Sequence, residues 1–269
     1  MIIGNHNFAE GHTYVMGILN VTPDSFSDGG RYNSADAALG HALAMISDGA
    51  AIIDVGGEST RPGYTMISDE EEIERVCPVI ERLKKETDVP ISLDTYKSKV
   101  AAAGIAAGAS LINDIWGLKY DPDMAGVIGS NDVSCCLMHN RNRDERPYND
   151  FVPDLLDDLR ETVAIAHAAG ISDEKIILDP GVGFGKNYEE NLLAIKHMGA
   201  LHELGYPILL GTSRKSVIGL TLDLPKDERE EGTLATSILA VREGCMFVRV
   251  HDVKANFRGI RMAEAVLNA

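Results

Sequence analysis

Eight short apolar stretches along the chain each end in a polar or glycine residue. They are Tyr14–Asn20, Ala51–Gly57, Pro90–Thr95, Ser110–Asp114, Val133–His139, Lys175–Pro180, Pro207–Thr212 and Cys245–His251. Segments with helical periodicity lie between most of them. Eight strands that alternate with helices predict an α/β fold, a closed parallel (β/α)₈ TIM barrel. Reactive groups in such a barrel gather at the carboxyl ends of the strands, so the polar strand ends indicate where the active site lies.

Apolar residues at intervals of three and four predict the helices. The first helix is expected to begin at Ser34, a residue type that caps helix N-termini. Further helices are predicted over Asp69–Glu86, Ser98–Ala107, Asp121–Gly129, Phe151–Ala169, Tyr188–Leu204 and Glu231–Glu243. Met1 to His12 holds alternating apolar residues, which predicts a short N-terminal hairpin that covers the base of the barrel.

The length of the chain suits this architecture. It has 269 residues, and a (β/α)₈ barrel typically needs about 250. Because no proline-rich linker or break in composition divides the sequence, we expect residues 1–269 to form a single domain.

Charge and composition narrow the class of partner. The net charge of −16 argues against a general nucleic-acid binder, which needs clustered Lys and Arg. No apolar run approaches the roughly 20 residues of a membrane-spanning helix. Met1 to Tyr14 lacks a basic segment followed by an apolar one, so we expect a cytoplasmic protein.

The four cysteines show no CxxC spacing. Adjacent Cys135 and Cys136 should point to opposite faces of a strand, which makes a disulfide between them implausible. Buried, reduced thiols are the favoured interpretation of these two and of Cys77 and Cys245, with a catalytic cysteine as the weaker alternative.

Two connections are too elaborate for plain turns. Val21–Asn33 follows the first strand and Ser59–Ser68 follows the second, and both are polar and contain Gly and Pro. Asn140–Asn149, which intersperses Arg with Asn, Asp and Glu, is a third. Long loops at the carboxyl end of a barrel are more often lids or binding loops than spacers.

Many charged and amide side chains occur at or just after the strand ends. The acids and amides are Asn20, Asp94, Asn113, Asp114 and Asp179, and the cationic groups are Arg61, Lys215, Arg249 and His251. Ion pairing between buried groups explains a few of them. The whole set is costly to desolvate unless a ligand or metal completes its bonding, so we expect a binding site.

The two groups imply different ligand chemistry. A cationic patch in an acidic protein selects anionic groups, and the N–H groups of Gly211–Ser216, which should open a helix, offer a second anion site. Asp94, Asn113 and Asp179 present oxygens to a ligand rich in N–H donors. A fused aminopyrimidinone ring fits, because one carboxylate accepts two parallel N–H bonds.

Other chemistries lack their motifs. The histidines are not in HExxH spacing, and no GxSxG sequence is present. Gly181–Lys186 does not match GxxxxGK[ST], and its plain interpretation is a strand-end turn that tolerates positive φ.

Taken together, the motifs resemble those of the dihydropteroate synthase family. The matching stretches are MGILNVTPDSFSDGG at Met16–Gly30, DVGGESTRPG at Asp54–Gly63, DT at Asp94–Thr95, NDI at Asn113–Ile115, MH at Met138–His139, LDPGVGFGK at Leu178–Lys186, GTSRKS at Gly211–Ser216 and RVHDV at Arg249–Val253. The first two are long and specific, and the set runs in order over almost the entire chain.

This resemblance implies that 6-hydroxymethyl-7,8-dihydropterin pyrophosphate condenses with 4-aminobenzoate to give dihydropteroate and pyrophosphate. It assigns the pterin to Asp94, Asn113, Ile115, Met138, Asp179, Lys215 and Arg249. It assigns aminobenzoate to Phe26, Thr60, Arg61, Pro62, Phe184 and Ser213. It assigns pyrophosphate to Asn20, Thr60, Arg61, Arg249 and His251, with Mg²⁺ near Asn20. Arg61, Lys215, Arg249 and His251 are the implied catalytic residues. Sulfonamides would act as competitive inhibitors, and the protein would be a homodimer.

Two alternatives remain beside this hypothesis. A pterin-dependent methyltransferase shares the barrel and the pterin-holding acids but needs no pyrophosphate patch. A non-catalytic pterin-binding subunit should have lost loop or patch residues, and no matched motif is broken. Among single residues, Asp114 and His139 have structural interpretations, and Arg214 is expected to point outward.

Overall fold

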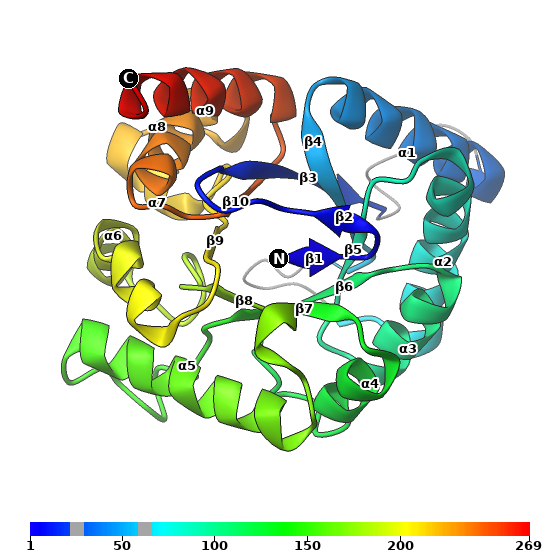
Figure 1. Cartoon of the computed structure of the whole chain (residues 1–269), viewed down its shortest axis with the longest axis horizontal. Helices are drawn as coiled ribbons and strands as arrows, with labels where there is room; N and C mark the ends of the chain where they lie inside the picture. Colours follow the sequence, from blue (N-terminus) through cyan, green and yellow to red (C-terminus); the bar gives the residue numbers. More distant parts are fainter. Residues whose placement is uncertain (22–29, 59–65) are drawn as a thin grey trace.

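The computed structural model describes residues 1–21, 30–58 and 66–269, without the side chains of residues 30–34. A parallel sheet of eight strands forms the centre of this part of the chain, and helices surround it (Figure 1). The strands of this sheet are β3 (Tyr14–Asn20), β4 (Ala50–Gly56), β5 (Ile91–Asp94), β6 (Leu111–Asp114), β7 (Ser134–Met138), β8 (Ile176–Asp179), β9 (Leu209–Leu210) and β10 (Phe247–Val250).

Helices follow most of the strands. They are α1 (Gly30–Ser47), α2 (Asp69–Glu86), α3 (Ser98–Ala107), α4 (Met124–Asn131), α5 (Phe151–Ala168), α6 (Tyr188–Lys196), α7 (Ser216–Leu222), α8 (Glu230–Arg242) and α9 (Val253–Leu267). The strand order is β8-β7-β6-β5-β4-β3-β10-β9. A parallel bridge between Leu178 and Ile208 joins the two ends of the sheet. The predicted barrel is confirmed.

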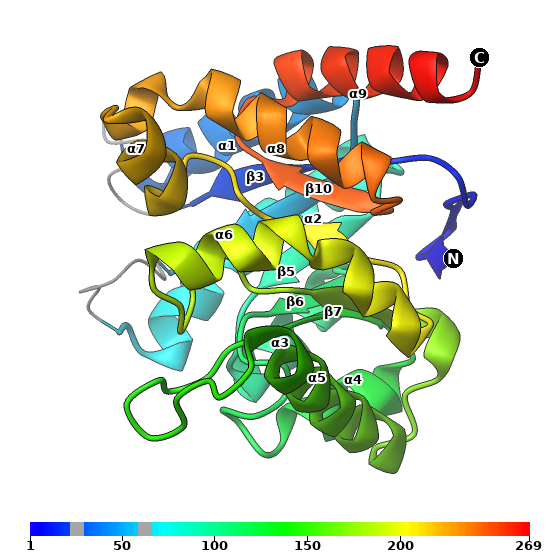
Figure 2. The same ribbon diagram turned by 90° about the vertical axis from the view of Figure 1, so that its left-hand side faces the viewer.

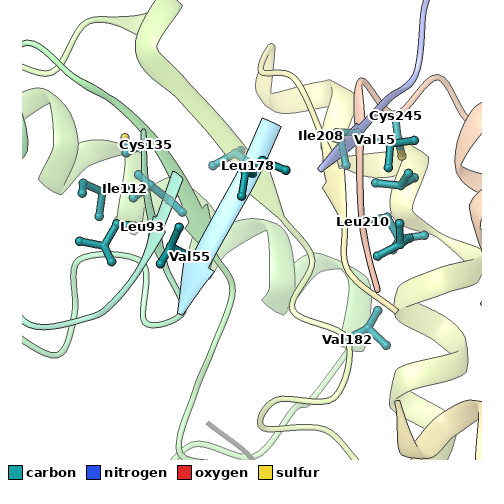
Figure 3. Packing of buried hydrophobic residues seen from close by; sticks show 14 of the residues in the cluster. Val15, Val55, Leu93, Ile112, Cys135, Leu178, Val182, Ile208, Leu210 and Cys245 are labelled. Carbon is teal, nitrogen blue, oxygen red and sulfur yellow. The ribbon is translucent and has the colours of Figure 1, made fainter. Parts of the chain in front are cut away.

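Alternation along each strand divides the side chains between two layers. Outward residues pack beneath the helices in one large cluster; Figure 3 labels Val55, Leu93, Ile112, Leu178 and Leu210 among its members. Inward residues form a second cluster, which includes Met16, Ile52, Leu111, Cys136, Ile177, Leu209 and Phe247. Because side chains alternate with a period of two, the next inward position of each strand lies one layer closer to the carboxyl end.

The predicted N-terminal hairpin is present and covers the amino ends of the strands. Strands β1 (Ile2–Ile3) and β2 (His6–Asn7) pair antiparallel. Ser134 at the start of β7 donates a hydrogen bond to the Ile2 carbonyl at 3.3 Å. Figure 2 shows this hairpin at the same end of the molecule as the C-terminus. A cavity of about 530 Å³ opens at this end, lined by side chains that include His12, His202 and Tyr206.

The structure corrects several helix boundaries. Helix α1 begins at Gly30, four residues before the predicted Ser34. The predicted Tyr188–Leu204 helix is α6 followed by a 3₁₀ segment at Met198–Leu204. Helix α4 covers Met124–Asn131 where Asp121–Gly129 was expected.

Helix α9 was not predicted because its inward face is only half apolar. Its buried residues are Val253, Asn256, Ile260 and Glu264. The Glu264 carboxylate accepts a 2.7 Å hydrogen bond from the Thr13 amide. This bond satisfies a buried polar side chain at a position where a regular apolar stripe would have a hydrophobic residue. Within the described ranges, no helix combines the length and the hydrophobicity that crossing a membrane requires.

The four cysteines are free thiols, as predicted, and Cys135, Cys136 and Cys245 are buried, whereas Cys77 is only partly buried. Cys135 belongs to the outer cluster and Cys136 to the inner one, so their side chains lie on opposite faces of β7. Burial raises the pKa of both thiols, which keeps them protonated and unreactive.

The outer layer should carry much of the stability. Leu93 is fully buried under α2 and α3, so Leu93→Ala should lower the free energy of unfolding by about 2–5 kcal/mol. Leu192→Ala on α6, where the side chain is 40% exposed, is the matched control and should cost less than half as much. Urea unfolding measures both. Equal losses would show that Leu93 does not carry the core packing described here.

Candidate active site

A polar layer lies directly above the apolar interior of the barrel. Asp54 is two residues beyond Ile52, and Arg249 is two beyond Phe247. Asn113 and Asp179 follow Leu111 and Ile177 in the same way. The alternation that fills the lower barrel with apolar groups therefore turns these polar side chains inward at the carboxyl end.

The Arg249 guanidinium is held between two carboxylates. Its Nε donates to Asp54 Oδ2 at 2.6 Å, and its Nη2 donates to Asp94 Oδ2 at 2.6 Å. Asn113 Nδ2 also approaches Asp54 Oδ2, at 3.4 Å. These charge-assisted bonds fix the plane of the guanidinium. Sequence reasoning missed Asp54, although it is the first residue of the DVGGESTRPG stretch and follows Ile52 by two.

Asp179, Lys215 and Arg249 converge around one glycine. A Cβ atom at Gly211 would lie 3.6 Å from Asp179 Oδ2, 3.8 Å from Lys215 Nζ and 3.9 Å from Arg249 Cβ. The absence of a side chain at Gly211 leaves room at this corner. The three residues expected to hold one ligand therefore share a space, although they come from three separate segments of the chain.

Burial shifts the ionisation of this cluster. Burial, with help from the neighbouring Asp54 carboxylate, raises the pKa of Asp94 to about 7 despite the opposing Arg249 charge. Burial also raises the pKa of Asp179 and lowers that of Lys215 to about 8. Desolvation opposes the charge on Arg249, but Asp54 and Asp94 outweigh it and raise its pKa. Arg249 is thus the permanent cation, while Asp94 and Lys215 titrate near neutral pH.

Ser213 and His251 form a second polar group on the same rim. Ser213 Oγ lies 2.9 Å from His251 Nδ1 and accepts a 3.1 Å bond from the His251 amide. The adjacent Arg214 turns to Asp252, to whose Oδ2 its Nε donates at 3.0 Å, and its side chain is partly exposed. The expectation that Arg214 points outward is therefore consistent with its ion pair.

An apolar wall borders the polar corner. Ile115 and Met138 are buried together with Tyr96, and Trp116 and Phe184 pack against them. Lys215 Nζ lies 4.9 Å from the centre of the Phe184 ring. Tyr96 and Trp116 were not predicted, because aromatic residues just after a strand are equally typical of plain core packing.

Asn20 ends β3 beside the acid cluster. A Cβ atom at Gly56 would lie 3.8 Å from Asn20 Oδ1 and 3.7 Å from Asp94 Oδ2, so both oxygens border the same space. Among the residues the structure describes, no group of three or more His, Cys, Asp or Glu side chains could hold a metal ion. Any cation here would need most of its ligands from water or substrate.

Four of the expected site residues cannot be compared with the structure. Phe26, Thr60, Arg61 and Pro62 lie outside the described residues. Lys97 contacts the chain on both sides of residues 59–65. It is buried, pairs with Glu58, and donates to the Ile67 carbonyl and to Glu72 Oε2, each at 2.8 Å.

Asp114 and His139 have the structural roles proposed for them. The Asp114 carboxylate accepts backbone N–H bonds from Trp116 and Leu118, each at 2.8 Å. Burial raises the pKa of Asp114 to about 6. His139 is buried, and desolvation together with the nearby Lys186 charge lowers its pKa to about 3, so its ring is neutral.

The turn at Gly181–Lys186 is not a phosphate loop but a tight strand-end turn. Gly181, Gly183 and Gly185 all have positive φ, at 70°, 87° and 55°. A Cβ atom at Gly181 would come within 1.9 Å of the His139 carbonyl oxygen, so only glycine fits.

Comparison with known proteins agrees with this geometry. The family model described as pterin binding enzyme matches residues 16–251. The chain belongs to this family, among the dihydropteroate synthases. The dihydropteroate synthase of Clostridium beijerinckii is 57% identical over 269 residues, 99% of each chain.

Solved structures agree over the whole fold. A dihydropteroate synthase from Clostridium difficile, determined in the presence of pteroic acid, is 50% identical with a TM-score of 0.94, covering 98% of this chain and 100% of that one. The Yersinia pestis dihydropteroate synthase in a sulfonamide drug complex is 41% identical with a TM-score of 0.92, covering 100% and 98%.

Removing the central cation should shift the titration of its neighbour. Arg249→Met should raise the pKa of Asp94 further above about 7, because the nearest positive charge is lost while Asp54 remains. A ¹³C NMR titration of aspartate-labelled protein measures this shift. Arg82→Met, which removes a surface partner of Asp36, should leave Asp94 unchanged. A fall in the Asp94 pKa of the Arg249 variant would contradict the arrangement.

Proposed function

We propose that this chain condenses 6-hydroxymethyl-7,8-dihydropterin pyrophosphate with 4-aminobenzoate and releases 7,8-dihydropteroate and pyrophosphate. The observation that carries this proposal is the convergence of Asp179, Lys215 and Arg249 around Gly211. That corner combines acceptors for a heterocycle with cations for a phosphorylated group. Membership of the dihydropteroate synthases makes the protein a transferase.

The carboxylates and the amide hold the pterin. Asp179 Oδ1 already accepts the Gly181 amide at 2.7 Å, which orients the carboxyl group and leaves Oδ2 toward Gly211 for N–H donors of the ring. Asn113 and Lys215 add polar contacts. Ile115 and Met138 supply apolar contact, and the guanidinium plane of Arg249, fixed by Asp54 and Asp94, stacks on the ring face.

The cations then stabilise the leaving group. The bond between the pterin methylene carbon and the pyrophosphate oxygen breaks, and its electron pair leaves with pyrophosphate. Arg249, His251 and, by the sequence resemblance, Arg61 stabilise the charge that develops there, while Asn20 and Thr60 bind it. Asp94 and Asp179 favour the positive, ring-stabilised pterin fragment.

The amine of 4-aminobenzoate completes the reaction. It attacks the methylene carbon, a carbon–nitrogen bond forms, and the nitrogen releases a proton to solvent. The amine is nucleophilic without assistance, so the mechanism assigns no general base. Phe184 and Ser213, with Phe26, Thr60, Arg61 and Pro62 from the two loops, surround the aminobenzoate ring. A sulfonamide resembles this substrate and would compete for the same place, in line with the drug complex of the Yersinia pestis relative.

Mg²⁺ fits the oxygen donors of this site. Asn20 Oδ1 and the Asp94 carboxylate border one space, and Mg²⁺ is usually held by one or two such groups plus substrate phosphates. When bound, the ion would neutralise charge on the pyrophosphate. Asn20 would hold it against the leaving group.

The wider setting is also part of the proposal. We expect a homodimeric, cytoplasmic enzyme whose residues 1–269 form a single domain. A pterin-dependent methyltransferase is the alternative activity. It gives no reason for Lys215, Arg249 and His251 to gather at one rim, and the dihydropteroate synthase relatives do not favour it.

A direct assay tests the proposed reaction. Purified protein with Mg²⁺ and both substrates should form dihydropteroate and pyrophosphate in equal amounts. Lys215→Ala should reduce turnover by at least about 10²-fold, as loss of one preorganised hydrogen-bond donor in an active site does, and Lys196→Ala on α6 is the matched control. Activity of Lys215→Ala near that of the wild type, or pyrophosphate release without dihydropteroate, would refute the proposal.

A further inference from the structure

Lys186 is a partly buried lysine next to the site, and the reaction described above does not use it. Its Nζ lies 2.9 Å from His139 Nδ1, 2.9 Å from the Gly181 carbonyl oxygen and 3.1 Å from the Phe184 carbonyl oxygen. An ammonium group has three N–H donors and no acceptor. The three neighbours therefore match the hydrogen-bonding capacity of its charged form, although burial lowers the pKa of Lys186 to about 7.

This contact requires one tautomer of His139. Nδ1 can accept from Lys186 only if it carries no proton, so the ring proton is on Nε2. His139 Nε2 lies 2.9 Å from Asp158 Oδ2 and donates to it. The neutral ring thus links a carboxylate on α5 to the ammonium group of Lys186.

Asp158 is itself firmly held. Arg141 Nε donates to Asp158 Oδ2 at 2.7 Å. Arg146 Nη1 lies 2.9 Å from Asp158 Oδ1. Burial alone would raise the pKa of Asp158, but hydrogen bonds from His139 and Arg141 outweigh it and hold the pKa at about 2. The anchor of the network is therefore a permanent carboxylate.

The segment Asn140–Tyr148, to which the resemblance gave no role, packs against the same turn. The Arg141 guanidinium lies over the Tyr148 ring at 4.2 Å, and the Tyr148 hydroxyl donates to the Gly185 carbonyl at 3.3 Å. A Cβ atom at Gly185 would lie 2.4 Å from the Arg141 carbonyl oxygen. Arg141 and Tyr148 thus contact the turn at Gly185, and Lys186 bonds to its Gly181 and Phe184 carbonyl groups.

Two groups of this turn, the Phe184 ring and the Val182 carbonyl, contact Lys215. The Phe184 ring lies beneath Lys215, and the Val182 carbonyl oxygen accepts a 2.5 Å hydrogen bond from Lys215 Nζ. Lys186 bonds to the carbonyl groups of Gly181 and Phe184, on either side of Val182. Its loss would free the backbone that sets both contacts.

We propose that Lys186 is a positioning residue for the reaction: linked through neutral His139 to Asp158, it fixes the turn 181–185 so that Phe184 and Lys215 meet the substrates in the reactive geometry. The inference rests on the proposed function, since it assigns 4-aminobenzoate to Phe184. It predicts a larger defect in aminobenzoate use than in pterin use, because Asp94, Asn113, Ile115 and Met138 lie on or just after other strands and keep their places. Among the pterin contacts, Asp179 and Lys215 bond to the turn.

Steady-state kinetics of Lys186→Met test this. The Met side chain fills similar volume but cannot bond to His139, Gly181 or Phe184. The KM for 4-aminobenzoate should rise, and kcat should fall, each by at least about tenfold, as a small misplacement of reacting groups does. The KM for the pterin pyrophosphate should rise less than that for 4-aminobenzoate. Lys175→Met is the matched control. Lys175 lies just before β8, at the end of the strand away from the turn, and donates to the Asp132 carbonyl. The control variant should leave all three parameters unchanged.

Two further measurements keep the outcome clear. Lys186→Arg retains a cation with N–H donors, but its planar fork does not match three diverging acceptors, so its aminobenzoate KM should lie between those of the wild type and the Met variant. This variant serves even if Lys186→Met does not fold. ¹⁵N NMR of histidine-labelled wild type should show His139 protonated on Nε2 and unprotonated on Nδ1, and the Nδ1 signal should shift in Lys186→Met.

The possible failures are distinguishable. An active wild type with folded Lys186 variants that keep wild-type KM and kcat would overturn the positioning role alone, as would a His139 protonated on Nδ1. A loss of thermal stability with unchanged KM values would show a merely structural lysine. A wild type that makes no dihydropteroate would overturn the proposed function itself.

Discussion

The ion pairs of Arg249 with Asp54 and Asp94 are the interaction on which the site depends. Burial and the neighbouring Asp54 carboxylate raise the pKa of Asp94, and the charge of the shared guanidinium opposes that rise. The same bonds fix the plane of the cation, which is the surface available to a flat heterocycle. One buried group thus sets both the electrostatics of the acid cluster and the shape of the binding corner.

The barrel places this group by simple alternation. Phe247 faces the apolar interior with Ile3 and Phe8 of the hairpin beneath it, and Arg249 is the next inward residue on β10. Beyond the intervening β9, Ile177 and Asp179 repeat the relation on β8. The lower layer consists of buried apolar side chains that support the polar layer above it. Support from outside the layer comes from the network of Asp158, His139 and Lys186, which fixes the turn after Asp179 without touching a reactant.

Much of this could be predicted from the sequence, because strand ends in a parallel barrel meet at one edge whatever the details of packing. That rule alone brings Asp94, Asn113, Asp179 and Arg249 together. Asp54 was missed because an acid inside an apolar run is equally typical of a structural ion pair. Helix α9 was missed because buried Asn256 and Glu264 interrupt its apolar face. The partners of Lys186 lie up to 47 residues away in sequence, and no local pattern reveals such contacts.

A crystal structure of this protein with a non-hydrolysable analogue of the pterin pyrophosphate tests the central claim most directly. The account predicts that the pterin ring bonds to Asp179 and Asn113 with the Arg249 guanidinium against its face, and that the diphosphate lies toward His251. A ring that binds elsewhere, such as in the cavity at the base beside His12 and Tyr206, or a complex in which Arg249 leaves Asp54 and Asp94, would contradict it.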